Sequence, residues 1–292
     1  MKQVATYILT LCAAACVLAA AAVRLCVAET PALKCNGSPL LCDKRYDQVV
    51  FPATHNSTSN IEDKWKFPNH FFPVSRQLED GIRGLNIDLF SYQGDIYTCH
   101  TYCAFGNKKL SGVLADIKKF MDQNPGEVVT IFLEYYEGSA RVPELIAESG
   151  LAALALPHKK GEQWPTLRQM IESGRRLVVF STDAADPAKY PWYLSTREFS
   201  VWSPYFAEKP KELSCGSGLI KRADQIYVMP NFLTNPVANP ELAKKVNFES
   251  FLTRRTSKCA EAVGAVPNFI QIDFYSIGDL IGTVRKLNGI QE

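Results

Sequence analysis

Six polar or ionisable side chains lie at or near the ends of short apolar runs that are typical of strands: His55, Asn56, Asn86, Asp88, Glu134 and Asp273. An unperturbed imidazole titrates near neutral pH, so His55 and His100 suit the roles of general base and general acid. The amide and carboxylate oxygens suit a hard divalent cation such as Ca²⁺ or Mg²⁺. A base, an acid and a divalent cation in one pocket favour in-line displacement at a phosphodiester.

The elements that must bring these side chains together are short apolar runs separated by segments with helical spacing. Strands are expected at 49–51, 85–90, 128–133, 177–180, 226–229 and 269–274. Helical spacing covers 113–121 and 277–287, whereas 182–218, rich in Pro, Trp and Tyr, is expected to form long loops. Strand–helix units over about 250 residues favour an α/β barrel of parallel strands, whose carboxyl ends meet on one face.

Each of these side chains also has a simpler explanation, because a single polar residue at a strand end often turns to solvent. Four strands that each deliver such a group to the same edge argue against that explanation for the set. Asn86 and Asp88 are two residues apart, so a strand points both to the same side. The other histidines, His70 and His158, lack such neighbours and are expected to be structural or to lie at the surface.

The first 28 residues have the features of a secretory signal peptide. A basic start at Lys2 precedes an apolar run over 7–23, and small residues precede Glu29. The alternative is an uncleaved membrane anchor, since the run approaches the shortest length that spans a bilayer. We expect a secreted protein in which residues 29–292 form a single catalytic domain.

The charge balance gives no sign of a nucleic-acid partner. Lys and Arg number 32 and Asp and Glu number 30, and the net charge of +2 comes from the first 28 residues. A chain that binds nucleic acid would carry a basic excess in its folded part. We expect no nucleic-acid partner and a monomeric protein.

Six cysteines remain after residue 28, and this even number suits disulfides in an oxidising compartment. Closure between neighbours in the sequence gives the favoured pairing: Cys35–Cys42, Cys99–Cys103 and Cys215–Cys259. The alternative is a zinc site at Cys99, His100 and Cys103, but the sequence lacks a second spaced Cys/His pair. Asn36 begins a glycosylation sequon, Asn36-Gly37-Ser38.

Several segments form a combination of motifs that is specific when taken together. They are FPATHNSTSN, QLEDGIRGLNIDLF, CHTY, NPGEVVTIFLEYY and, more weakly, PNFIQIDFY. The combination resembles the X domain of phosphatidylinositol-specific phospholipase C over residues 45–137 and 265–289. This resemblance implies a distorted TIM-type (β/α)8 barrel of the PLC-like phosphodiesterase kind. It also implies cleavage of phosphatidylinositol, at a membrane surface, to diacylglycerol and a cyclic inositol phosphate.

The resemblance implies a role for each candidate side chain. His55 corresponds to the general base that removes the proton of the inositol 2-hydroxyl, and His100 to the general acid that protonates the diacylglycerol oxygen. Asp273 corresponds to the carboxylate that orients the base. Four residues correspond to the calcium positions of the metal-dependent branch: Asn56, Asn86, Asp88 and Glu134.

The chain departs from both branches of this family. Compact bacterial members work without metal and place an arginine and a lysine where this chain has Asp88 and Glu134. Two neighbouring carboxylates are costly unless a cation joins them or one is protonated, so we expect dependence on Ca²⁺, with Mg²⁺ as the alternative. The metal-dependent branch usually has a glutamate where Asn86 stands, which predicts a weaker cation site.

Other contacts with the substrate are less specific. Arg83 and Lys189 are candidates for contact with the substrate phosphate. Several aromatic side chains of the middle segment either engage the membrane interface or pack their loops onto the barrel. They are Trp192, Tyr193, Trp202, Tyr205 and Phe206.

Two other functions stay open at this point. One is a related barrel phosphodiesterase, such as a glycerophosphodiester phosphodiesterase or a sphingomyelinase D-like enzyme, which also combines two histidines with carboxylates and a divalent ion. The other is a secreted effector or binding protein that keeps the fold without turnover. The presence of both histidines argues against the second alternative, because function depends on the site and not on the fold.

Overall fold

The computed structural model describes residues 32–135, 137–183 and 185–291. Its strands are β1 (Phe51–Thr54), β2 (Gly84–Tyr92), β3 (Asp95–Cys99), β4 (Asn107–Lys109), β5 (Val129–Glu134), β6 (Leu177–Ser181), β7 (Tyr193–Ser195), β8 (Ser200–Trp202), β9 (Ile226–Pro230) and β10 (Phe269–Ile272). Its α-helices are α2 (Val74–Glu79), α3 (Leu110–Gln123), α4 (Arg141–Glu148), α5 (Leu167–Glu172), α6 (Thr196–Phe199), α7 (Pro240–Ala243), α8 (Glu249–Val263) and α9 (Leu280–Leu287). Short 3₁₀ turns cover Pro39–Leu41, Tyr46–Gln48, Cys103–Phe105, Leu151–Ala153 and Pro210–Glu212.

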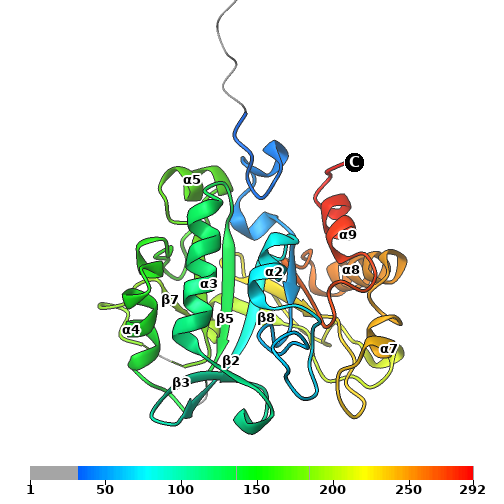
Figure 1. The fold of residues 1–292 in the computed structure, drawn as a ribbon. Coiled ribbons are helices and arrows are strands. Elements are labelled where there is room, and N and C mark those ends of the chain that lie inside the picture. Colours follow the sequence, from blue (N-terminus) through cyan, green and yellow to red (C-terminus); the bar gives the residue numbers. More distant parts are fainter. Residues whose placement is uncertain (1–31, 136, 184, 292) are drawn as a thin grey trace, which may run out of the picture. The chain divides into compact units, whose positions relative to one another are not determined.

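The parallel strands form a ring with one opening. They are hydrogen-bonded in the order β7-β6-β5-β2-β1-β10-β9-β8, and β10 pairs back onto β1 with Phe269 opposite Phe51. Among the described strands, β7 and β8 end this path and do not pair with each other, although α6 joins them directly along the chain. Figure 1 shows the helices arranged around these strands. The predicted distorted (β/α)8 barrel is thereby confirmed, with its opening between β7 and β8.

An antiparallel hairpin extends from β2, and the sequence analysis did not anticipate it. The far half of β2 pairs with β3, and β3 pairs with β4, with Cys99 opposite Asn107. Gln93 and Gly94 link β2 to β3, and both have positive φ, as two-residue hairpin turns require. The hairpin determines the position of His100, which directly follows β3.

The segment 182–218, predicted to be long loops, contains β7, α6, β8 and a 3₁₀ turn. The prediction was wrong there because β7 and β8 have only three residues each, too few to show the two-residue alternation of a strand. The last strand is also shorter than predicted and ends at Ile272, so Asp273 lies just beyond it.

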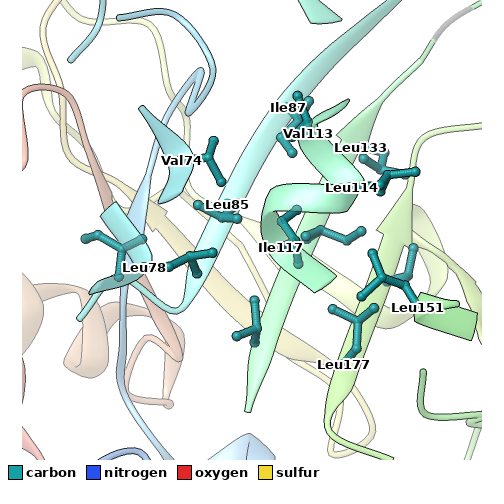
Figure 2. Close-up of a cluster of buried hydrophobic side chains, with 14 of the residues drawn as sticks. Val74, Leu78, Leu85, Ile87, Val113, Leu114, Ile117, Leu133, Leu151 and Leu177 are labelled. Carbon is teal, nitrogen blue, oxygen red and sulfur yellow. The ribbon is translucent and has the colours of Figure 1, made fainter. Parts of the chain in front are cut away.

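The strands send alternate residues to the two faces of the ring. Their outer faces join an apolar core with the helices, and Figure 2 shows part of it, with residues of β2 and β5 packed against α2 and α3. On β2 the outward residues are Leu85, Ile87 and Leu89, so Asn86 and Asp88 point into the barrel. The same alternation on β5 turns Glu134 inward.

Aromatic rings fill the interior of the barrel below the polar side chains. Phe51 stacks on Phe269 with ring centroids 5.0 Å apart, and Phe132 stacks on Phe180 at 5.2 Å. Phe132 also meets Phe269 edge to face. These rings close the interior beneath the carboxyl ends of the strands, so the open space for a ligand lies at those ends.

The six cysteines pair as Cys35–Cys42, Cys99–Cys103 and Cys215–Cys259, the pairing that closure between neighbours favoured. This pairing removes the alternative of a zinc site. The predicted signal peptide lies outside the described residues and stays a prediction, as does the domain boundary after residue 28. In the part of the chain that the structure describes, no helix has the length and apolar character needed to cross a bilayer.

Gly84 is packed closely against Ala53 and Phe269, and this close packing predicts an effect of substitution on stability. A Cβ added there would lie 2.7 Å from the Cβ of Ala53 and 2.8 Å from a ring carbon of Phe269. We expect Gly84→Ala to lower the free energy of unfolding by about 1–3 kcal/mol, measured by urea denaturation, because the interior must shift to admit the methyl group.

Gly112, inside helix α3, provides a matched control for this substitution. The closest atom to a Cβ added there is a flexible lysine carbon at 3.6 Å, so Gly112→Ala is expected to raise the free energy of unfolding by up to about 1 kcal/mol. Equal effects of the two substitutions would contradict the close packing at Gly84.

Candidate active site

His55 follows β1 and is fixed on several sides. Its Nδ1 lies 3.0 Å from Oδ1 of Asp273, and its ring stacks on Phe232 with centroids 3.8 Å apart and planes 4° from parallel. Its backbone N–H donates to the carbonyl of Ile272, and its own carbonyl accepts from Nε2 of His70 at 2.6 Å. The imidazole is therefore held by a carboxylate, an aromatic face and the backbone.

Asp273 orients His55 and also influences its charge. The carboxylate is 3% exposed, and its Oδ1 accepts a second hydrogen bond from Nδ2 of Asn69 at 2.9 Å. Burial by itself would lower the pKa of His55, but the negative charges of Asp273, Asp88 and Glu134 together raise that pKa above its ordinary value. His55 is consequently a stronger base than a free imidazole.

A chain of amides fixes the orientation of the asparagines beside His55. Because a carboxylate only accepts, Asn69 turns its nitrogen to Asp273 and its oxygen to Nδ2 of Asn56, 3.5 Å away. Oδ1 of Asn86 accepts the backbone N–H of Asn56 at 3.2 Å, and Nδ2 of Asn86 donates to Glu134 at 2.7 Å. Asn86 therefore presents its nitrogen, not its oxygen, toward the carboxylates.

Asp88 and Glu134 lie opposite each other on β2 and β5. Burial and the charge of Glu134 raise the pKa of Asp88 to about 7, although His55 opposes the rise. Such a pair fits a divalent cation, which would relieve the repulsion. The oxygen of Asn56 has no hydrogen-bond donor among the described residues and fits the same role, whereas the oxygen of Asn86 does not.

The donor set is small for a metal site. Within the described residues, no three His, Cys, Asp or Glu side chains gather as a metal-binding cluster. Two carboxylates and one amide oxygen leave most positions of a six- to eight-coordinate Ca²⁺ to water or a ligand. The prediction that the asparagine at position 86 weakens the cation site thus acquires a geometric reason, because its oxygen faces the backbone N–H of Asn56 and its nitrogen faces Glu134.

Two cavities meet at His55. One, of about 220 Å³, is lined by His55, Glu134, Phe132, Trp202 and Phe232, among others. The other, of about 290 Å³, is lined by both His55 and His100. The two histidines therefore share the second cavity. The first cavity, which we call the aromatic cavity, is lined by both His55 and Glu134 and by several aromatic side chains.

His100 differs from His55 in its charge state. Burial and the positive charge of His55 lower its pKa to about 4, with a small opposing effect from Asp273. At neutral pH the free protein therefore holds His100 as a neutral imidazole. An anionic group that enters the shared cavity would favour the imidazolium.

The structure places neither of the two candidate phosphate contacts beside the histidines. Arg83 precedes β2 at the amino end of the strands, where it forms an ion pair with Glu127 at 2.7 Å. Lys189 lines neither cavity beside His55; its ammonium lies 3.7 Å from Glu144 and over the ring of Tyr190. Long side chains that find carboxylates nearby give no signal in the sequence that separates them from phosphate ligands.

The aromatic side chains proposed to engage the membrane or to pack their loops differ in how far they are buried. Trp192 and Tyr193 are buried against the barrel, while Tyr205 and Phe206 are 65% and 71% exposed and Tyr205 borders the aromatic cavity. Trp202 lines that cavity as well.

The histidines without predicted chemistry are buried inside the protein. His70 donates to the backbone of His55, and burial lowers its pKa to about 4. His158 stacks on Trp164 with centroids 3.8 Å apart.

Asn36, the sequon residue, exchanges two hydrogen bonds with the backbone of Val128, and attachment of a glycan to its nitrogen would break one of them.

The sequence analysis missed several residues of the site. Asn69 and Phe232 contact Asp273 and His55, Gln271 lines the aromatic cavity, and Lys66 lines the cavity shared by the histidines. Position alone could have suggested Phe232, because it follows the end of β9 closely. Asn69 lies in a loop with no pattern, and only the folded chain brings it to Asp273.

The chain is similar to known proteins in sequence and in fold. A family model described as PI-PLC X matches residues 41–288. A PI-PLC X domain-containing protein of Arabidopsis thaliana is 27% identical over 286 residues, which cover 89% of this chain and 64% of the relative. PI-PLC X domain-containing protein 1 of Arthroderma benhamiae is 27% identical over 280 residues, covering 88% and 90%. An uncharacterised secreted protein of the same species is 28% identical over 290 residues, covering 88% and 64%.

Solved structures resemble the fold. The phosphatidylinositol-specific phospholipase C of Listeria monocytogenes superposes with a TM-score of 0.57 at 18% identity, covering 90% of this chain and 97% of that one. A mutant of the Staphylococcus aureus enzyme gives 0.58 at 13% identity, covering 86% and 95%. At such identities the likeness shows the fold alone.

Removal of the charge of Asp273 tests the electrostatics of His55. We expect Asp273→Asn to lower the pKa of His55, because the carboxylate that favours the imidazolium is lost while burial remains. Titration of the histidine ring signals by NMR measures this shift, and any reaction that needs neutral His55 should then begin at lower pH. Asp43→Asn, at a surface carboxylate paired with Arg168, is the control and should leave the His55 titration unchanged. A pKa of His55 unaffected by Asp273→Asn would contradict the assignment.

Proposed function

The chain belongs to the PI-PLC X-domain family, and from that premise we propose that it is a phosphoric diester hydrolase that cleaves phosphatidylinositol. The products would be diacylglycerol and a cyclic inositol phosphate. The observation that carries this proposal is the shared cavity of His55 and His100, with His55 bound to Asp273. The chain spans 64% of the Arabidopsis relative, so the activity of the whole protein is part of the proposal.

The proposed reaction uses the two histidines in sequence. Nε2 of His55 takes the proton of the inositol 2-hydroxyl, and the hydroxyl oxygen attacks the adjacent phosphorus. The bond between phosphorus and the glycerol oxygen breaks, and that oxygen takes a proton from His100. Asp273 stabilises the imidazolium formed at His55.

The protonation of His100 is proposed to depend on the bound substrate. Its pKa of about 4 in the free protein would leave no proton to donate at neutral pH. A bound phosphodiester places a negative charge in the cavity that His55 and His100 share, and this charge favours the protonated ring. Binding of the substrate is thus proposed to convert His100 into the acid.

Asp88, Glu134 and the oxygen of Asn56 are the side chains proposed to hold a divalent cation. When bound there, the cation would offset the negative charge that develops on a non-bridging phosphate oxygen. Asn86 is proposed to position Glu134 through its 2.7 Å hydrogen bond instead of coordinating. Ca²⁺ is the proposed ion and Mg²⁺ the alternative.

Exposed aromatic side chains support action at a lipid surface. Tyr205 and Phe206 are the exposed members of the aromatic set, and Tyr205 borders the cavity beside Glu134. Aromatic residues favour the membrane interface, so these two are proposed to contact the bilayer. Secretion is also a proposal, supported by the signal-like first 28 residues and by the relative called secreted.

The proposed activity predicts release of cyclic inositol phosphate from phosphatidylinositol vesicles. We expect His55→Ala and His100→Ala each to lower turnover about 100-fold or more, the usual scale for loss of acid–base catalysis. His158→Gln, at a buried histidine that lines neither cavity, should keep most of the activity.

Other outcomes of this assay favour the alternatives. Release of choline or of glycerol phosphate from other lipids would favour a related barrel phosphodiesterase. No turnover of any lipid by the folded protein would favour the effector or binding protein. Full activity in either alanine variant would remove that histidine from the mechanism.

The proposed cation site predicts loss of turnover in a chelator and recovery on addition of Ca²⁺ or Mg²⁺. We expect Asn86→Glu to tighten Ca²⁺ binding, measured by calorimetry, because it adds a carboxylate to the cluster. Glu134→Gln should weaken it. Asp279→Asn, at the amino end of α9, is the matched control for an added or lost charge. Full activity in the chelator would refute the role of the cation and leave the two histidines in place.

A further inference from the structure

His100 lies inside a small covalent ring. Cys99 ends β3, Cys103 begins a 3₁₀ turn, and their disulfide spans four residues of separation with Cα atoms 4.9 Å apart. The enclosed residues are His100, Thr101 and Tyr102, and His100 and Thr101 both line the cavity shared with His55.

Apart from the disulfide, the hydrogen bonds and ring contacts of this segment among the described residues involve its backbone and Tyr102, not the ring of His100. Among the described residues, no hydrogen bond is made to the His100 ring, whereas His55 has a carboxylate and a stacked phenyl ring. The segment has one internal backbone bond, from the N–H of Tyr102 to the carbonyl of His100 at 2.7 Å. Tyr102 is 64% exposed and meets the ring of Phe105 edge to face with centroids 5.5 Å apart, so this contact holds the far end of the segment and not the His100 ring.

The backbone at Thr101 shows that the loop is constrained. Its φ is +63°, in the left-handed region that a β-branched residue rarely adopts. A free chain would relax from this conformation. The disulfide joins the two residues that flank this segment, Cys99 and Cys103. It prevents that relaxation and so maintains the position of the neighbouring His100.

We propose that the Cys99–Cys103 disulfide is the positioning device for His100, and that a dithiol reductant switches off the acid by opening it. This inference rests on the proposed role of His100 in the reaction. In the opening step the sulfur–sulfur bond accepts two electrons and two protons to give two thiols, while the dithiol becomes a disulfide.

Burial makes this disulfide the one that a reductant reaches first. Cys103 is half-buried, whereas the other five cysteines of the described residues are between 0% and 7% exposed. Limiting dithiol should therefore open Cys99–Cys103 before the other two bridges. Mass spectrometry after alkylation of free thiols identifies the bond that opens.

The first test separates loss of the acid from general damage. Two substrates are compared: an inositol phosphodiester with an alkyl leaving group and its nitrophenyl analogue, whose leaving group needs no proton. In the variant Cys99→Ser with Cys103→Ser, we expect kcat for the alkyl ester to fall about tenfold or more, with little change for the nitrophenyl ester. The matched control, Cys35→Ser with Cys42→Ser, should affect both substrates equally or neither.

Equal losses on both substrates in the Cys99/Cys103 variant, or no loss, would overturn the proposal. If that variant fails to fold, the same comparison uses the wild-type protein opened by limiting dithiol and then reoxidised. Activity on the alkyl ester should fall and return with the disulfide.

The second test does not depend on turnover. The chain has four histidines, so their ring signals are resolvable by NMR. Opening of the bridge should shift or broaden the His100 signal and leave that of His158 unchanged. An unmoved His100 signal would overturn the positioning role, whereas absence of turnover on both esters by the oxidised protein would refute only the proposed function.

Discussion

The two-residue period of the strands is the constraint on which the site depends. One face of each strand is sealed against helices by residues such as Leu85, Ile87 and Leu133, so a strand cannot rotate or slip by one residue without burying polar groups in that core. Asn86 and Glu134 therefore point into the barrel. Hydrophobic burial on the outer face of the strands thus fixes which side chains point into the barrel. Contacts within the site do not need to supply the free energy that holds the strands in register.

The site gathers several carboxylates around His55. Asp88 and Glu134 are neighbours across a strand pair, and Asp273 is hydrogen-bonded to His55. The carboxylates raise the pKa of His55, and its positive charge in turn lowers that of His100. These charges support the proposal that a cation binds beside the carboxylates and an anion between the rings. A phosphodiester with a divalent cation has both charges.

The two histidines are held by different physical means. His55 has a hydrogen bond, a stacked ring and a bond to its backbone carbonyl, all from segments remote in sequence. His100 sits at the end of a hairpin beside a disulfide. Weak interactions from several elements position the first, so it depends on the whole fold. A covalent ring positions the second, so it depends on local chemistry.

The sequence alone predicted the features that depend on regular alternation of residue types or on short separations along the chain. The apolar runs at 85–90 and 128–133 predict strands because burial of their alternate residues is visible in the residue types. Short spacings also indicated the cysteine pairs, since few residues separate Cys35 from Cys42 or Cys99 from Cys103. The combination of motifs around His55, Asp88, His100 and Glu134 indicated the family, and residues 41–288 match its model.

Only the tertiary structure decided which side chains meet and how they are oriented. Arg83 was a candidate phosphate contact in the sequence, but the folded chain pairs it with Glu127, 44 residues away. Asn69 joins Asp273 across 204 residues, and the oxygen of Asn86 turns to a backbone N–H that no sequence pattern reveals. Strand period fixes the face of a residue, but contacts between distant segments fix its hydrogen bonds, and those depend on how the whole chain closes.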